Sequence, residues 1–119
     1  MSTAKVVRER IEEDGKVFSA LYLELKNACI IFLSEGEESL GTLAMSVPPR
    51  GRMVGPPLSS ILIGDRNLMV ARLLAERVAS IIGKIVLVSV FIKTINEMVA
   101  GPILLKLIER VMKRRSEPG

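Results

Sequence analysis

The segment from residue 58 to residue 92 constrains the fold more than any other, because three different apolar patterns follow one another along it. Residues 58–63 form a short apolar run that ends at Gly64. Asp65 follows, where a carboxylate can cap the free N–H groups of a starting helix. Through residues 67–82 the apolar side chains recur at helical spacing, and charged side chains take the other side. This order predicts a strand, a sharp turn and an amphipathic helix.

The same segment ends in a second strand. Gly83 stands where a helix commonly stops in a left-handed conformation, and Lys84 begins the exit from the helix. Residues 85–92 are almost continuously apolar and rich in valine, which is typical of a strand buried on both faces. We therefore expect a β-α-β unit, and nothing in it has the pattern of a catalytic site.

Shorter alternating segments precede this unit. Residues 5–11 predict a first strand, and its neighbouring charged side chains favour an exposed edge. Residues 17–26 alternate with a clear period of two, which is the signature of a half-buried strand. Residues 28–34 and 40–47 predict the next two strands, with residues 35–38 as a hairpin tip between them. We interpret this part of the chain as a meander of short antiparallel strands.

Two connections and a final helix complete the chain. Residues 48–57 hold four prolines, two glycines and two arginines, so they predict a long loop, and long loops in compact domains are often functional. Residues 93–101 predict a second connection, and Pro102 suits the first turn of the helix that follows. The sequence therefore predicts an α+β fold. We expect an antiparallel sheet of five to six strands flanked by two or three helices, with a β-meander followed by β-α-β-α.

Chain length and composition set broader limits. We expect a single domain over residues 1–119, with frayed tails at residues 1–4 and 116–119. Cys29 has no second cysteine to pair with, so we interpret it as a small buried hydrophobe. The charged N-terminal segment is no secretory signal and no apolar stretch is long enough to span a bilayer, so we expect a cytoplasmic protein without membrane contact. The absence of Gln and His suggests a thermophilic, archaeal-like source.

A counting argument predicts a dimer. Two helices can cover only one face of a sheet of five or six strands, yet residues 17–23 and 85–91 are apolar on both faces. Strands of this kind are normally buried on both sides. Leaving apolar surface in water costs roughly 25 cal/mol per Å². We therefore infer that a second chain, most simply a second copy, covers the other face.

The residue types argue against an enzyme. The chain has no histidine, which is the commonest general base and metal ligand, and its single cysteine excludes a cysteine zinc site. The glycines of residues 51–55 lack the spacing of phosphate-binding loops. We interpret Glu35, Glu37 and Glu38 as a solvated hairpin tip rather than a cation site, and Asp65 as a helix cap rather than a catalytic acid. We expect no enzymatic activity and no cofactor or metal, although sequence alone does not exclude a serine–lysine pair.

The net charge of +4 is compatible with two kinds of partner, a nucleic acid or an acidic protein. Basic side chains gather at residues 113–115 and, in the loop, at Arg50 and Arg52. Aromatic residues that stack on bases are few and no nucleic-acid motif is present, so we expect no nucleic-acid partner. We interpret residues 113–115 as the complement of a helix dipole. A basic nucleic-acid-binding module stays open as the third interpretation, and salt-dependent retention on DNA or RNA would test it.

The order of segments also carries a family resemblance. The run ACIIFLSEGEESLGTLAMSV is followed by a proline-rich loop, the segment LSSILIGD, a helix, the strand KIVLVSV and a closing amphipathic helix. In this order, and in the Gly41-Thr42-Leu43 step, the chain resembles the proteasome assembly chaperone 3/4 family, and chaperone 3 more than chaperone 4. The resemblance covers residues 15–115, and its motifs are mostly apolar and structural. The long connection at residues 93–101 and the basic tail depart from the family pattern.

The resemblance implies a function by binding alone. Members of the family are homodimers or heterodimers with a paralogue, bind α-type subunits of the 20S proteasome, promote α-ring formation and leave as β-subunits join. The family loop equivalent to residues 48–57 is a candidate contact, so we expect Arg50, Arg52 and Met53 to bind the partner. The alternative is a small dimeric scaffold of the roadblock or profilin-like kind in a signalling or trafficking complex.

Overall fold

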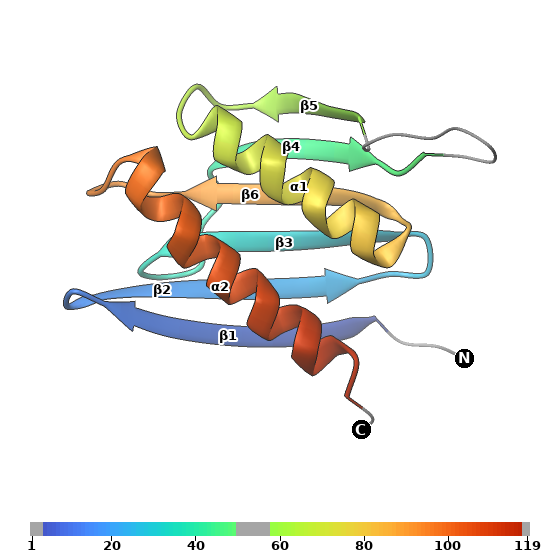
Figure 1. Ribbon diagram of the computed structural model, residues 1–119, viewed down its shortest axis with the longest axis horizontal. Coiled ribbons are helices and arrows are strands. Elements are labelled where there is room, and N and C mark those ends of the chain that lie inside the picture. The colour runs from blue at the N-terminus through green and yellow to red at the C-terminus, as the bar shows by residue number, and fades with distance from the viewer. Residues whose placement is uncertain (1–3, 50–57, 118–119) are drawn as a thin grey trace.

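In the computed structural model, which describes residues 4–49 and 58–117, two helices pack on one six-stranded sheet (Figure 1). Every strand that the sequence predicts is present. In chain order the elements are β1 (Lys5–Glu13), β2 (Lys16–Glu24), β3 (Ala28–Glu35), β4 (Thr42–Val47), β5 (Leu58–Ile63), α1 (Leu68–Ile82), β6 (Ile85–Phe91) and α2 (Glu97–Arg115).

The six strands form a mixed sheet in the order β1-β2-β3-β6-β4-β5. β3 and β6 run parallel, and the other neighbouring strands in the described part of the chain are antiparallel. The predicted α+β fold with a largely antiparallel sheet is therefore confirmed. β1, β2 and β3 form the first three strands of the predicted meander, but β4, its predicted fourth strand, does not pair with β3. The hairpin predicted at residues 35–38 is wrong, because β6 separates β3 from β4.

β5, α1 and β6 form the predicted β-α-β unit, but β4 lies between its two strands. Both strands of the unit are antiparallel to β4, so they run in the same direction. β6 is the more continuously apolar of the two and lies inside the sheet, whereas β5 lies at an edge. β6 is therefore paired along both of its edges, while Ile85 and Leu87 on its second face stay half-buried.

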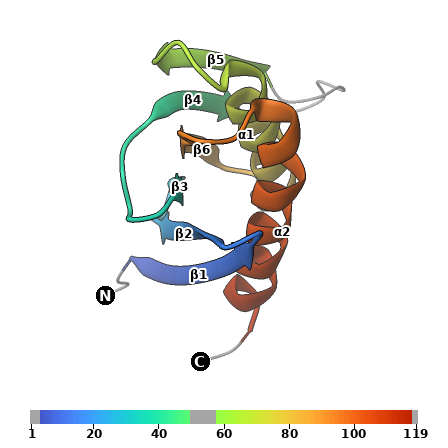
Figure 2. The same cartoon turned by 90° about the vertical axis from the view of Figure 1, so that its left-hand side faces the viewer.

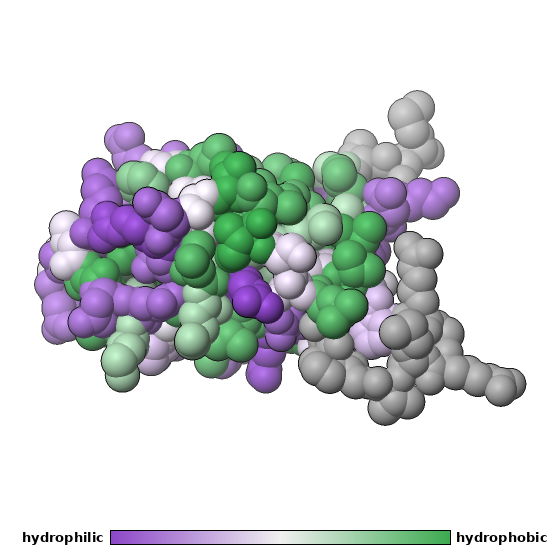
Figure 3. All heavy atoms as spheres, turned by 90° about the horizontal axis from the view of Figure 1, so that it is seen from above, coloured by the Kyte–Doolittle hydropathy of each residue, from purple (hydrophilic) through white to green (hydrophobic). Residues whose placement is uncertain are grey.

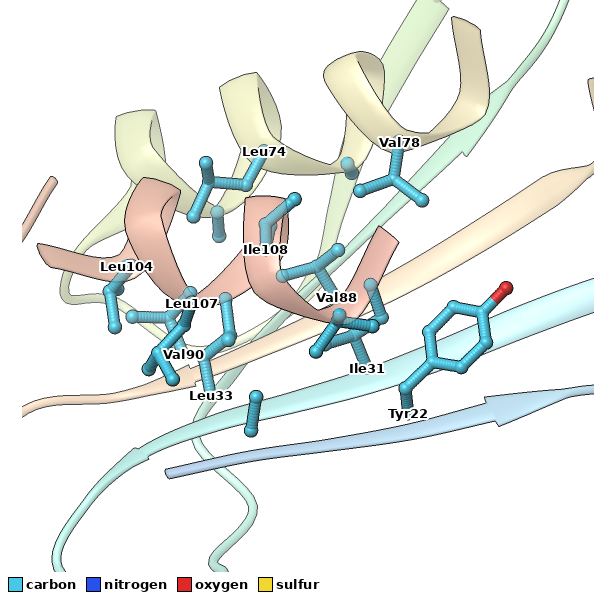
Figure 4. Close-up of a cluster of buried hydrophobic side chains, with 14 of the residues drawn as sticks. Tyr22, Ile31, Leu33, Leu74, Val78, Val88, Val90, Leu104, Leu107 and Ile108 are labelled. Atoms are coloured by element: carbon cyan, nitrogen blue, oxygen red, sulfur yellow. The ribbon is translucent and has the colours of Figure 1, made fainter. Parts of the chain in front are cut away.

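Figure 2 shows the sheet edge-on, with α1 and α2 on the same side of it. The predicted one-sided coverage by two helices is confirmed. Beneath the helices a row of buried side chains crosses five strands, one from each strand in register: Val7, Tyr22, Ile31, Val88 and Ala44. Figure 4 shows Leu74 and Val78 of α1 and Leu107 of α2 pointing toward this layer. The aliphatic side chains of both helices and one sheet face therefore make a single core.

α1 begins without the predicted Asp65 cap. Asn67 is the N-cap residue, with a φ of 58°, and its side chain makes no capping hydrogen bond. A carboxylate from the other helix takes this place, since Glu97 accepts a hydrogen bond from the backbone N–H of Val70 at 2.8 Å. Glu97 lies in the first turn of α2, so one carboxylate lies near the positive ends of both helices. The predicted end of α1 is confirmed, because Gly83 adopts a φ of 67°.

α2 begins at Glu97 rather than at Pro102, so the predicted connection over residues 93–101 is too long. The side chain of Asn96 caps the helix and accepts a hydrogen bond from Val99 N at 2.9 Å. Pro102 lies inside the helix on its exposed side, where its missing N–H leaves one carbonyl to solvent. The Asn96 cap therefore sets the helix start, and the proline does not.

A cluster of charged side chains fastens the end of α2 to the sheet. Arg115 donates to the two carboxylate oxygens of Glu24, at 2.6 and 2.9 Å. Lys84 and the Tyr22 hydroxyl donate to the same carboxylate, each at 2.6 Å. The hydrogen bonds from Arg115 and the other donors lower the pKa of Glu24 from its ordinary value of 4.5 to about 2, although burial opposes them. One carboxylate thus joins α2 to β2 and to the start of β6.

Replacing Glu24 with Gln should destabilise the fold in a pH-dependent way. The pKa of Glu24 is lower in the folded chain than in the unfolded chain, so its stabilisation is complete above about pH 4.5. It is lost as the pH falls toward about 2. At neutral pH we expect the free energy of unfolding to fall by about 3 kcal/mol. Urea unfolding at several pH values measures the difference, with the exposed Glu109→Gln as the control. A difference that does not change with pH would contradict this role.

Candidate docking face of the sheet

Neither helix lies on the second face of the sheet, which we call the open face (Figure 2). Along each strand the side chains alternate between the two faces, so the residues between core positions point to the open face. In β3, Ile31 and Leu33 are buried under the helices, while Ile30 and Phe32 between them are only half-buried. The second apolar face that the sequence predicts is therefore present and lies away from both helices.

An apolar row crosses the open face. The strand register pairs Val6 with Leu23, Leu23 with Ile30, Ile30 with Leu87 and Leu87 with Met45. The row spans five neighbouring strands, and all its side chains are half-buried or exposed. A contiguous apolar strip of this kind is typical of a protein–protein contact, whereas single exposed apolar residues are ordinary.

Further apolar pairs widen the row, and charged residues border it. Leu21 pairs with Phe32 on one side of the row, and Ala28 pairs with Ile85 on the other. Toward the β1 edge the open face becomes charged, because Arg8, Arg10 and Glu12 alternate with the core residues of that strand. A hollow of about 690 Å³ lies at this border, between β1, β2 and the start of the β3–β4 connection. An apolar centre with a polar rim is the usual arrangement of a protein interface.

The β3–β4 connection, residues 36–41, closes one end of the open face (Figure 2). It crosses β6, where the backbone N–H of Gly41 donates to the Ser89 hydroxyl at 2.8 Å. Ser89 is fully buried beneath it. Gly41 approaches β6 so closely that a Cβ atom at this position would lie 2.1 Å from the carbonyl oxygen of Val90. The connection therefore lies directly on β6 at this end of the open face.

Within residues 4–49 and 58–117, no three Asp, Glu or Cys side chains are grouped in a way that could hold a metal ion. Glu35 instead accepts hydrogen bonds from the backbone N–H groups of Lys93 and Thr94, at 2.9 and 3.0 Å. Burial opposes ionisation, but the hydrogen bond from the Thr94 hydroxyl and these two backbone bonds together lower the pKa of the Glu35 carboxyl. In the same described ranges, no helix has the length and apolar character needed to cross a membrane.

Cys29 is a core residue, as predicted. Its side chain is fully buried on the helix-covered side of β3. Burial raises the pKa of the thiol to about 12, which keeps it protonated near neutral pH. A protonated, buried thiol is a poor nucleophile, so this position contributes packing.

The residues predicted to contact a partner, Arg50, Arg52 and Met53, lie outside the described residues. Their role therefore remains a prediction. The other basic cluster, at the end of α2, makes contacts within the chain. Arg114 donates to the Glu9 carboxylate at 2.9 Å, and Arg115 belongs to the Glu24 cluster. These two cations hold α2 on the sheet, which is a larger role than the predicted complement of the helix dipole.

The sequence pattern predicts part of the apolar row but not its extent. It assigned Leu23 and Leu87 to a second apolar face, but it did not connect Val6 or Met45 with them. Val6 lies in a strongly charged strand, where its pairing with Leu23 is visible only from the register. Met45 joins the row because β6 is inserted beside β4, and no local pattern shows that insertion.

Comparison with known proteins adds a likeness of fold. No protein-family model and no curated protein matches the chain. Among solved structures, a chain from the crystal structure of a novel chaperone complex for yeast 20S proteasome assembly is similar to it. The match covers 98% of this chain and 98% of that one, with a TM-score of 0.68 and 16% sequence identity. The two chains therefore share their fold over nearly their full lengths.

Replacing Gly41 with Ala should disturb the end of the open face. The added methyl group cannot fit against the Val90 carbonyl, so the β3–β4 connection must move away from β6. We expect a loss of about 1–3 kcal/mol in the free energy of unfolding, because the Gly41–Ser89 hydrogen bond is broken. Chemical denaturation measures the loss. Gly101→Ala is the matched control, since its nearest neighbour is a Val70 methyl at 3.7 Å and helical alanine is favourable. Equal effects of the two substitutions would show that the approach to Val90 is not limiting.

Proposed function

We propose that this chain is a non-catalytic assembly chaperone that binds α-type subunits of the 20S proteasome and promotes formation of the α-ring. The observation that carries the proposal is the apolar row on the open face, which suits binding to protein and offers no group for chemistry. The fold shared with a chain of a yeast proteasome assembly chaperone complex supports it. The protein acts in the cytoplasm, where it needs no cofactor.

The proposed working form is a dimer joined through the open face. A second sheet stacked on this face would lie about 10 Å from the first, with side chains from both sheets interleaved. The row from Val6 to Met45 forms one half of such an interface. In a two-fold symmetric dimer the same residues of the second copy form the other half. The helices then lie on the two outer surfaces of the dimer, away from the interface.

Replacing Ile30 with Lys should weaken the dimer. Ile30 lies in the middle of the apolar row, between Leu23 and Leu87, so a charge there meets the apolar centre of the interface. We expect the dimer dissociation constant to rise by about 10- to 100-fold. Analytical ultracentrifugation over a concentration series measures it. Met98→Lys introduces the same charge at an exposed position on α2 and should leave the dimer unchanged. A wild-type chain that is monomeric at micromolar concentration would contradict the dimer.

The chaperone function is tested by binding to α-type subunits. We expect the chain to co-purify with an α-type subunit from its source cell, identified by mass spectrometry. The predicted loop contacts are tested by the double substitution Arg50→Glu and Arg52→Glu, which reverses the charge presented to an acidic partner. This variant should lower recovery of the subunit about tenfold at low salt and less at high salt.

The outcomes of this experiment separate the proposal from its alternatives. Unchanged recovery with the charge-reversed loop would remove Arg50 and Arg52 from the contact and leave the chaperone function in place. Recovery of a GTPase or a cytoskeletal protein in place of α-type subunits would replace the proposal with the scaffold function. Failure of the wild-type chain to bind any α-type subunit would overturn the proposal itself.

A further inference from the structure

The two edges of the sheet differ sharply in charge. β1 forms one edge, and six of its nine residues, KVVRERIEE, are charged. β5 forms the other edge with the sequence LSSILI, which contains no charged residue. An edge strand presents unpaired backbone N–H and C=O groups to any extended chain, and proteins commonly protect such edges with charges. β1 is protected in this way, while β5 lacks that protection and pairs only with β4 among the described strands.

Exposed apolar side chains surround the β5 edge. On the strand itself Leu58 is 76% exposed, Leu62 46% and Ile63 49%. On the adjoining helix the outward side chains of Met69 and Leu73 are also exposed. Figure 3 looks down on this edge and shows hydrophobic surface running across it. An unprotected edge strand with a contiguous apolar border has the features of a docking edge.

We propose that β5 accepts an extended segment of the α-type subunit as a seventh strand of the sheet. This inference rests on the proposed function and names the contact through which the subunit is held. Backbone hydrogen bonds to β5 supply the pairing, and apolar side chains at alternate positions of the segment contact Leu58 and Leu62. Arg72 lies beside the strand and donates to the Ser59 hydroxyl at 3.1 Å. That hydroxyl in turn donates to the Glu76 carboxylate, so a cation and an anion both lie at this part of the edge.

A second copy of this chain fits the edge less well than a foreign strand does. If β5 paired with β5 of a second copy, each α1 would lie mainly over β4 and β6 of its own chain. The two β4 strands would then be three strand spacings apart, and the two helices at least as far. That separation is roughly 14 Å, whereas packed helices lie about 8–10 Å apart. Met69 and Leu73 would stay uncovered.

The edge contact and the dimer contact use different groups of the sheet, although Leu58 pairs with Val47 and so stands on the open face with Met45. The proposed dimer uses side chains that stand perpendicular to the sheet, whereas the proposed strand pairing uses backbone groups in its plane. A dimer joined through its open faces would therefore present two β5 edges, one from each copy. Both proposed contacts can exist in one complex.

The test compares two matched double variants for binding to a purified α-type subunit from the same source. Leu58→Lys with Leu62→Lys places charges on the β5 edge, as β1 has on its own edge. Met98→Lys with Val99→Lys places the same charges at exposed apolar positions of α2. We expect the β5 variant to bind at least about tenfold more weakly than the wild-type chain, and the α2 variant to bind as the wild type does.

Hydrogen–deuterium exchange in the wild-type chain tests the backbone pairing directly. Addition of the α-type subunit should slow exchange of β5 amides and leave β1 amides unchanged, at constant concentration of the chain. Equal binding by both variants, or unchanged exchange in β5, would overturn the edge contact while the proposed function stands. A lower mass of the free β5 variant in solution would show that these leucines also contribute to the proposed dimer, and the exchange of wild-type β5 amides would then decide the edge contact by itself. Absence of any binding by the wild-type chain would overturn both proposals, which distinguishes that result from the others.

Discussion

Both helices pack on one face of the sheet, although its central strands carry apolar side chains on both faces. The rest of the structure depends on this one-sided burial. Consecutive residues of β3 show the constraint at its simplest: Ile31 is fully buried under the helices, and Ile30 faces the opposite way and is only half-buried. The register repeats this division across five strands, so the core row from Val7 to Ala44 has an apolar counterpart from Val6 to Met45 on the open face. The chain thus has a complete core and an uncovered apolar surface, which favours association over chemistry.

Charged contacts at the two ends of α2 fasten it to the rest of the fold. At its start, Glu97 binds the backbone of α1, and at its end Arg115 binds Glu24 on β2. α2 is therefore bound to the rest of the fold at both ends, and its Glu97 also binds the first turn of α1. A sheet held by helices fixed in this way presents its open face already shaped for a partner, so little conformational freedom is lost on binding.

Local patterns predicted most of the fold. Alternation located the strands and helical spacing located α1, because both depend on neighbours within a few residues. The errors occurred where distant contacts decide. Asp65 was predicted to cap α1, but Glu97 from the other helix binds the first turn of α1 instead. Pro102 was predicted to begin α2, but the helix begins five residues earlier, after the Asn96 cap. The open face was predicted in outline, but Met45 joins its row only because β6 inserts beside β4, and single-strand patterns carry no record of strand order.

The position of β6 also has a consequence for how the chain comes together. β6 is the last strand in sequence, yet it lies between β3 and β4. In the described part of the chain it provides the only strand pairing that joins the two halves of the sheet. The β1–β3 meander and the β4–β5 pair can each form early from nearby residues, but they cannot meet until residue 91 has emerged from the ribosome. Until then both halves expose strand edges that belong inside the finished sheet, and this is the interval in which the nascent chain is most open to mispairing.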